Sequence, residues 1–163
     1  MIAPNTSKRL LAIALLVLAG LLGWRAVRQR SGPSEQAFFY DQSRQQLFKA
    51  PRTAIPPIRG VDGPEEDAAR AVVISTTGKP GDKSSWTVAY LEQYSPELKR
   101  QMEAAQAQGT SPIMGRTEAQ QHRFVRRLTD REWFALNTPE AEVILTGWAA
   151  PGPNGITPVV CTP

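Results

Sequence analysis

The chain has 163 residues, of which 41% are hydrophobic and 21% charged, with 14 Pro, 12 Gly, one Cys and one His. This length suits one small domain with an appendage. A single cysteine excludes an internal disulfide and a cysteine-based zinc cluster, a single histidine excludes a multi-histidine metal site, and the absence of a CxxCH motif excludes covalent haem attachment.

The positive net charge is concentrated near the N-terminus. Five of the 19 Lys and Arg residues lie within residues 1–31, which contain no acidic residue, so residues 32–163 hold 14 basic and 15 acidic residues. A nucleic-acid-binding domain needs clustered basic residues on its folded part. The local cluster there, Arg123, Arg126, Arg127 and Arg131, is interleaved with acidic residues and is interpreted as a solvated surface. We expect no nucleic-acid partner.

Residues 10–24, LLAIALLVLAGLLGW, form an uninterrupted apolar run between basic residues. As a helix this run is about 22 Å long, shorter than the roughly 30 Å hydrocarbon core of a bilayer. The span can still be completed, because flanking arginines extend their charges to the headgroups and a tryptophan lies at the interface. We therefore expect residues 1–30 to be a transmembrane anchor that contacts lipid through Leu10, Leu16, Leu22, Trp24, Arg9 and Arg25.

Two other interpretations of this apolar run are weaker. A cleaved secretory signal has the same charged start and apolar length, but no small-x-small cleavage site follows, and no Cys follows to accept lipid. A buried core helix on a soluble domain would have a polar face, and this run has none. The basic residues on its two sides nearly balance. The short basic N-terminal tail favours a cytoplasmic N-terminus, which predicts a single-pass protein of the bacterial inner membrane with an extracytoplasmic domain.

After the anchor, the sequence predicts a linker at 31–37, a small α+β domain at 38–148 and an irregular Pro-rich tail at 149–163. Apolar segments at 38–41 and 46–50, separated by four polar residues, predict a β-hairpin. The β-branched run at 70–76 and the alternating run at 85–91 predict a second hairpin. Prolines within 51–67 predict an extended connector across the surface.

The second half of the domain predicts two helices around a further strand. Ser95 and Thr138, each followed by Pro and Glu, are N-cap residues, and Gly109 ends the first helix. The first helix has a narrow apolar stripe at Leu98, Met102 and Ala105. The buried face of the second is expected to consist of Val143, Ile144, Leu145 and Trp148.

Between these helices, residues 122–128 predict a strand with Phe124 and Leu128 on one side, followed by a short apolar piece at 133–136. The expected fold class is therefore α+β: one N-terminal transmembrane helix, then a small, mainly antiparallel sheet with two helices packed on one face.

Three segments carry a resemblance to known proteins. FFYDQSRQQLF followed by PPI, YLEQYSPE, and VRRLTDREWFALNTPEAEVI resemble parts of uncharacterised, small, single-span bacterial membrane-anchored proteins. The resemblance covers most of residues 38–148. It implies an N-terminal anchor followed by a compact domain, and it assigns no catalytic residue.

The sequence also contains no convincing catalytic motif. His122 lies in a polar context, Cys161 lies in the Pro-rich tail, and no GxSxG motif marks a nucleophilic serine. Lys79 follows Gly78, but a Pro and then a strand follow where a P-loop requires a helix. The acidic loop at 62–67 is interpreted as solvated, with weak cation binding as the alternative. We expect no catalytic residue, no cofactor and no metal.

Aromatic residues are numerous for a domain of this size. Neighbours in a strand point to opposite faces, so one member of Phe38-Phe39 and one of Trp133-Phe134 is expected to face away from the main core. Exposed aromatic side chains are typical anchors at protein interfaces. The candidate interface residues are Phe38, Phe39, Tyr40, Trp133 and Phe134.

These observations favour a non-catalytic, membrane-anchored accessory subunit that docks a small domain onto an integral-membrane or membrane-surface protein. One alternative is a pilin-like or secretion-system subunit, whose short leader ending in Gly and Glu near the start of the apolar helix are missing here. The other is an envelope enzyme that uses the carboxylates of Glu65 and Glu66.

Overall fold

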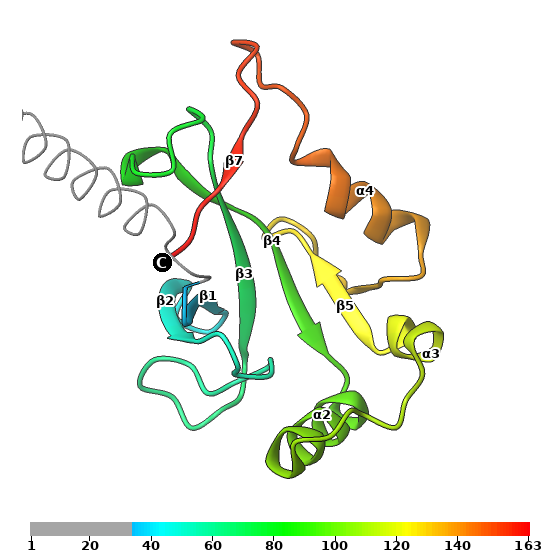
Figure 1. Ribbon diagram of the computed structural model, residues 1–163. Coiled ribbons are helices and arrows are strands. Elements are labelled where there is room, and N and C mark those ends of the chain that lie inside the picture. The colour runs from blue at the N-terminus through cyan, green and yellow to red at the C-terminus, as the bar shows by residue number, and fades with distance from the viewer. Residues whose placement is uncertain (1–33) are drawn as a thin grey trace, which may run out of the picture. The chain divides into compact units, whose positions relative to one another are not determined.

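The computed structural model describes residues 34–163 (Figure 1). The predicted anchor residues Leu10, Leu16, Leu22, Trp24, Arg9 and Arg25 lie outside the described residues. Residues 35–163 form a single unit. No helix in the described part of the chain is both long and apolar enough to cross a membrane.

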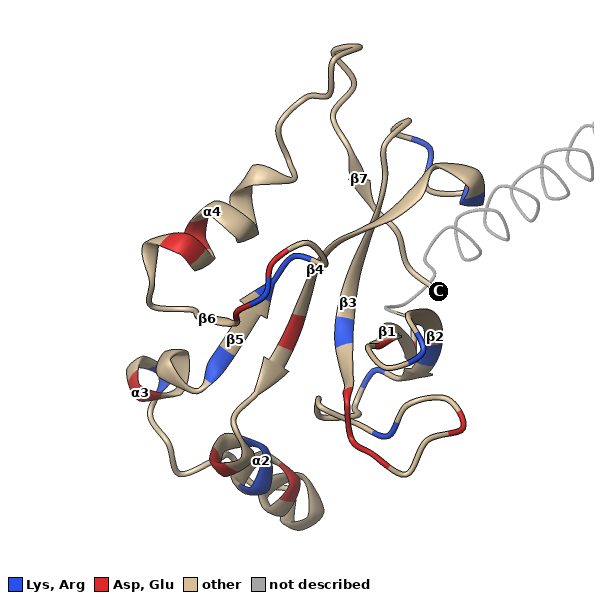
Figure 2. Cartoon of the chain, turned by 180° about the vertical axis from the view of Figure 1, so that it is seen from behind, with Lys and Arg blue, Asp and Glu red and all other residues tan. Residues whose placement is uncertain are grey.

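One antiparallel sheet is the centre of the fold. Its strands are β1 (Gln36–Asp41), β2 (Gln46–Pro51), β3 (Ala68–Ser75), β4 (Trp86–Tyr94), β5 (Arg123–Arg126), β6 (Phe134–Ala135) and β7 (Val159–Val160). The strand order is β2-β1-β3-β4-β5-β6, and β7 pairs with β3 (Figures 1 and 2). The predicted mainly antiparallel sheet is confirmed.

Both predicted hairpins are present. In the first, Phe39 pairs with Phe48 and Tyr40 with Leu47, and β1 begins at Gln36, within the predicted linker. The second hairpin pairs β3 with β4 and contains a register shift between Val72 and Val73. Both hairpins form where short apolar runs are separated by polar turn residues, which explains why local pattern was sufficient to find them.

Three α-helices occur within residues 34–163: α2 (Pro96–Gln108), α3 (Arg116–Gln121) and α4 (Pro139–Gly147). A 3₁₀ turn, η1 (Lys83–Ser85), precedes β4. The predicted caps are confirmed. The Leu98 amide donates to Ser95 Oγ at 3.1 Å and the Ala141 amide donates to Thr138 Oγ1 at 3.3 Å. Gly109 ends α2 in the left-handed region, at φ 64°, where glycine has no steric penalty.

The sequence predicts two helices in the domain, and this number is wrong because the described residues also contain α3. This helix has only six residues, and it follows a Gly- and Pro-containing stretch, so its sequence has too few turns to show a helical period.

Two details differ from the predictions. Strand β5 ends at Arg126, so Leu128 lies beyond it and is 42% exposed, and the buried residue of the strand is Val125. In α4, Ile144 is buried and Leu145 and Trp148 pack against the second core cluster, as predicted, whereas Val143 is 58% exposed and the additional buried residue is Ala141.

The connector and the tail are more ordered than their prolines suggest. Ile55 and Pro56 in the connector are buried, so it is not purely a surface segment. The tail is mostly irregular, but β7 pairs with β3, and the amide of Cys161 donates to Val73 O at 2.8 Å. Cys161 is only 4% exposed and belongs to the core.

The core consists of two clusters. The first contains Phe38, Ala69, Ala71, Val73, Leu91 and Cys161. The second contains Tyr90 and Val125 from the sheet and Ala141 and Ile144 from α4. Helix α4 therefore packs against the sheet through the second cluster.

Candidate functional site

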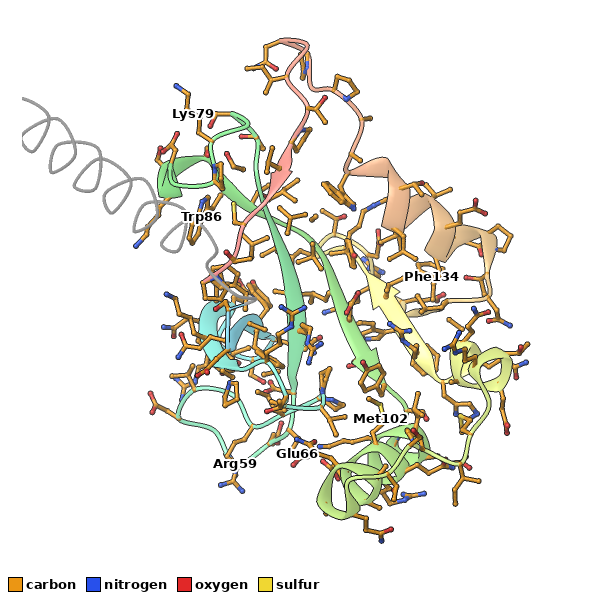
Figure 3. The ribbon with its side chains drawn as sticks, in the orientation of Figure 1. Arg59, Glu66, Lys79, Trp86, Met102 and Phe134 are labelled. Carbon is orange, nitrogen blue, oxygen red and sulfur yellow. The ribbon has the colours of Figure 1, made fainter. Side chains whose placement is uncertain are left out.

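A concave surface lies beside helix α2. Two basins of about 370 and 390 Å³ share Tyr94, Met102 and Pro112 as lining residues, so they adjoin each other. We call the pair the α2 groove. Each volume lies in the lower part of the range that is typical of ligand pockets. Met102, labelled on α2 in Figure 3, marks the place where the basins meet.

Apolar side chains form much of the lining of the α2 groove. The shared lining is extended by Ile55 in the first basin and by Leu98 and Met114 in the second. Leu98 is buried, whereas Met102 and Met114 are half-buried. A methionine thioether on a flexible side chain adapts to different apolar partners. The groove therefore offers an adaptable apolar contact surface.

Four arginines also line the α2 groove, and no carboxylate does. Arg52 and Arg70 line the first basin, and Arg116 and Arg123 line the second. Figure 2 shows basic positions on β3 and β5, which carry Arg70 and Arg123. In the described part of the chain, the ion pairs within 4.0 Å all involve Lys99. Among residues 34–163, the four guanidinium groups therefore lack a carboxylate partner within that distance.

Two of these arginines are positioned by contacts of their own. One terminal nitrogen of Arg70 donates to the carbonyls of Arg52 and Ala54 at 2.9 and 2.7 Å, while its Nε is buried without a partner. The guanidinium carbon of Arg123 lies 5.9 Å from the centroid of the Tyr94 ring, within cation–π range. These contacts hold the charges in place at the groove without neutralising them.

The nearest acidic residue in the sheet register is Glu92, which is paired with Arg70 between β4 and β3. It does not line either basin, and among residues 34–163 it forms no ion pair within 4.0 Å. The charged side chains that line the groove itself are therefore all basic, although Glu66 and Glu103 line a neighbouring cavity that shares Ile55 and Gln106 with the first basin.

One wall of the groove is the segment that follows α2, which contributes Thr110, Pro112 and Met114 to the lining. Gly109 turns the chain, and the Thr110 amide donates to Ala105 O at 2.9 Å. Farther along, the Met114 amide donates to Gln101 Oε1 at 3.0 Å. Ile113, between these two attachments, is 95% exposed. The wall is thus tied to α2 at both ends and presents an apolar side chain to solvent.

On another side of α2, Lys99 holds the acidic loop. It is 8% exposed, and its Nζ donates to Pro57 O at 2.7 Å and to Glu66 Oε2 at 2.5 Å. Glu103 lies 3.6 Å away on the same helix. A buried lysine is stable when its charge is paired and hydrogen-bonded, so Lys99 fastens the connector to α2.

The acidic loop is held at a second point by Asp41. This carboxylate is 1% exposed and accepts the amides of Arg44 at 2.8 Å and Val61 at 2.7 Å. Asp67 accepts the amide of Ser43 at 3.0 Å. Among the described residues, no group of three or more potential ligands is arranged to hold a metal ion. These carboxylates are therefore explained by their contacts with backbone amides.

The single histidine is paired with a serine. Ser95 Oγ lies 2.9 Å from His122 Nδ1, and the same oxygen accepts the Leu98 amide as the cap of α2. Within residues 34–163, no carboxylate bonds to His122 as an orienting third group. Neither residue lines the α2 groove. The pair joins the start of α2 to the end of α3, which is a structural role.

The Gly78-Lys79 turn is organised by hydroxyl groups. The amide of Lys79 donates to Ser75 Oγ at 3.2 Å, and Ser75 Oγ lies 2.8 Å from Ser85 Oγ. Hydrogen bonds from Ser84 lower the pKa of Asp82 below its ordinary value. Because η1 and then β4 follow the turn, this amide does not form part of a P-loop.

The aromatic pairs are divided between the two faces of the sheet. Phe38 packs edge-on against Trp86 at 5.3 Å, and Phe39 lies 6.0 Å from Phe48. Phe38 belongs to the first core cluster and Phe39 does not, which agrees with the expectation that one of them faces away from the main core, but both are buried, at 5% and 0% exposure. Other side chains therefore cover both faces of the sheet at Phe38 and Phe39.

The other candidate interface residues are half-buried. Tyr40 and Trp133 pack against the first core cluster, and Phe134 packs against the second, beside α4 (Figure 3). Their contact with a partner stays a prediction, but they do not form one continuous exposed aromatic surface.

The α2 groove was missed by reasoning from sequence. Its arginines come from the connector, β3, α3 and β5, and none of them forms a local motif. The local signal for the groove is the apolar stripe that contains Leu98 and Met102, both of which line it.

Comparison with protein-family models, with curated proteins and with solved structures gives no match for this chain.

Proposed function

We propose that the chain is a non-catalytic, membrane-anchored interaction subunit. Its N-terminal segment holds it in the bacterial inner membrane as a single-pass protein, and its domain outside the cytoplasm binds a larger membrane-associated protein. The α2 groove is the contact surface. Its four arginines without a lining carboxylate, beside an apolar surface, are the observation that carries this proposal.

Two further points support a binding function over catalysis. The buried carboxylate of Asp41 and the pair Ser95–His122 are both engaged in contacts that hold the fold together. Confinement to a membrane also raises the effective concentration of the domain near its partner, so a groove of modest size is sufficient for stable association.

The test is purification of the full chain from native membranes in mild detergent, through an affinity tag placed after Pro163. The groove variant Arg116→Glu/Arg123→Glu is compared with Arg59→Glu/Arg131→Glu, which makes the same charge change at exposed positions outside the groove. We expect a stoichiometric integral-membrane partner with the natural chain and the control, and its loss with the groove variant.

A protein that purifies only as a monomer or homo-oligomer would contradict the proposed function. Retention of the partner by the groove variant would contradict the assignment of the α2 groove as the contact surface.

A further inference from the structure

We propose that the α2 groove binds an acidic peptide segment of the partner, in which carboxylates flank at least one large apolar side chain. This inference rests on the proposed function and deepens it by naming the chemistry of the bound segment.

The acidic character follows from the charges in the groove. Each basin contributes two arginines, Arg52 and Arg70 in one and Arg116 and Arg123 in the other, and neither is lined by a carboxylate. A guanidinium group presents a planar set of donors that matches a carboxylate in two-point geometry. A negatively charged segment therefore gains favourable contacts without displacing an existing ion pair of these arginines.

The apolar requirement follows from what lies between the two pairs of arginines. Tyr94, Met102 and Pro112 are shared by both basins. Leu98 and Met114 extend this apolar surface in the second basin, and Ile55 extends it in the first. A large apolar side chain placed here removes this surface from water. An anion without such a side chain would leave this surface exposed.

The four arginines are divided between two adjoining basins, and this arrangement favours an extended ligand. A small anion would engage one pair of arginines and leave the other pair free, whereas a peptide carries carboxylates at intervals along its length. An anionic membrane surface is the competing source of negative charge, and the experiment below distinguishes it.

The experiment measures fluorescence anisotropy with the full chain in nanodiscs of neutral lipid. The probe is a fluorescein-labelled peptide, Asp-Glu-Leu-Phe-Glu-Asp. One comparison peptide replaces Leu-Phe with Ser-Ser, and another replaces every acidic residue with Lys. The protein variants are Arg116→Glu/Arg123→Glu, the matched control Arg59→Glu/Arg131→Glu, and Met102→Ser, which changes the apolar contact alone.

We expect the acidic apolar peptide to bind the natural chain and the matched control alike. Charge reversal at Arg116 and Arg123 should weaken binding roughly tenfold or more and should favour the lysine peptide. Both Met102→Ser and the Ser-Ser peptide should weaken binding several-fold. Raising NaCl from about 0.05 to 0.5 M should also weaken it, because exposed charges are screened.

Three results would overturn the inference: no binding of the acidic peptide, equal binding by the groove and control variants, or binding of vesicles rich in anionic lipid in place of the peptide. If the acidic peptide fails while charge reversal still removes the co-purified partner, the proposed function stands and only the chemistry of the segment is wrong.

Discussion

Replacing Asp41 with asparagine is expected to loosen the attachment between the acidic loop and the first hairpin. The Asp41 carboxylate is 1% exposed, with Oδ1 accepting the Arg44 amide and Oδ2 accepting the Val61 amide. Asparagine keeps one acceptor oxygen, but its NH₂ group faces the other amide donor. Loss of one charge-assisted hydrogen bond in a buried site costs about 1.5 to 3 kcal/mol, so the free energy of unfolding should fall by about that amount.

The assay is urea unfolding of the full chain in mild detergent, followed by near-ultraviolet circular dichroism. Hydrogen exchange at the amides of Arg44 and Val61 reports the local loosening. Asp62→Asn is the matched control, because it makes the same charge change at an exposed residue with φ 62°, a conformation that asparagine tolerates. The control should change stability by less than about 0.5 kcal/mol.

A second change tests the same contact from the other side. In Gly60→Ala the added Cβ would lie 2.7 Å from Asp41 Cγ and 3.0 Å from Asp67 Oδ1, which is too close without movement of the loop. If Asp41→Asn and Asp62→Asn are equally stable, the buried carboxylate does not hold the loop and the reasoning is refuted.

Three further predictions concern titration and buried polar groups. Burial raises the pKa of Tyr90 from 10.0 to about 12. The contribution of the neutral phenol to the free energy of unfolding is therefore complete below pH 10. It is lost between pH 10 and 12, where the unfolded chain releases the proton more readily than the folded one. Tyr90→Phe should remove most of that pH dependence of unfolding, on the order of 2 to 3 kcal/mol, and unchanged dependence would contradict the assignment. Lys99→Met removes the partner of Glu66 and of a connector carbonyl and should cost about 1 to 3 kcal/mol in urea unfolding, while the exposed control Lys49→Met should cost little. Burial raises the pKa of the Cys161 thiol, so it should react with Ellman's reagent roughly tenfold or more slowly at pH 8 in the native protein than in urea. Equal rates would show that the tail does not hold Cys161 in the core.

The elements that depend on neighbouring residues could be predicted from the sequence. Helices begin at Ser95 and Thr138 because the side-chain oxygen of each accepts a backbone amide within the first turn. Helix α2 ends at Gly109 because glycine adopts the left-handed conformation of a C-cap. The two hairpins form from short apolar runs on either side of polar turns, and their pairing confirms that pattern. The absence of a local catalytic motif likewise led to the expectation of a non-catalytic protein, which stays a prediction.

Tertiary structure decided which residues are buried and which come together. Val125 is in the core because of its register with Glu92 on β4, and Cys161 is buried because β7 pairs with β3, far away in sequence. The α2 groove brings together Arg52, Arg70 and Arg123 from three separated segments. Capping and turn formation depend on interactions between near neighbours, whereas registers, burial and grooves depend on contacts between distant segments, which exist only once the sheet has formed.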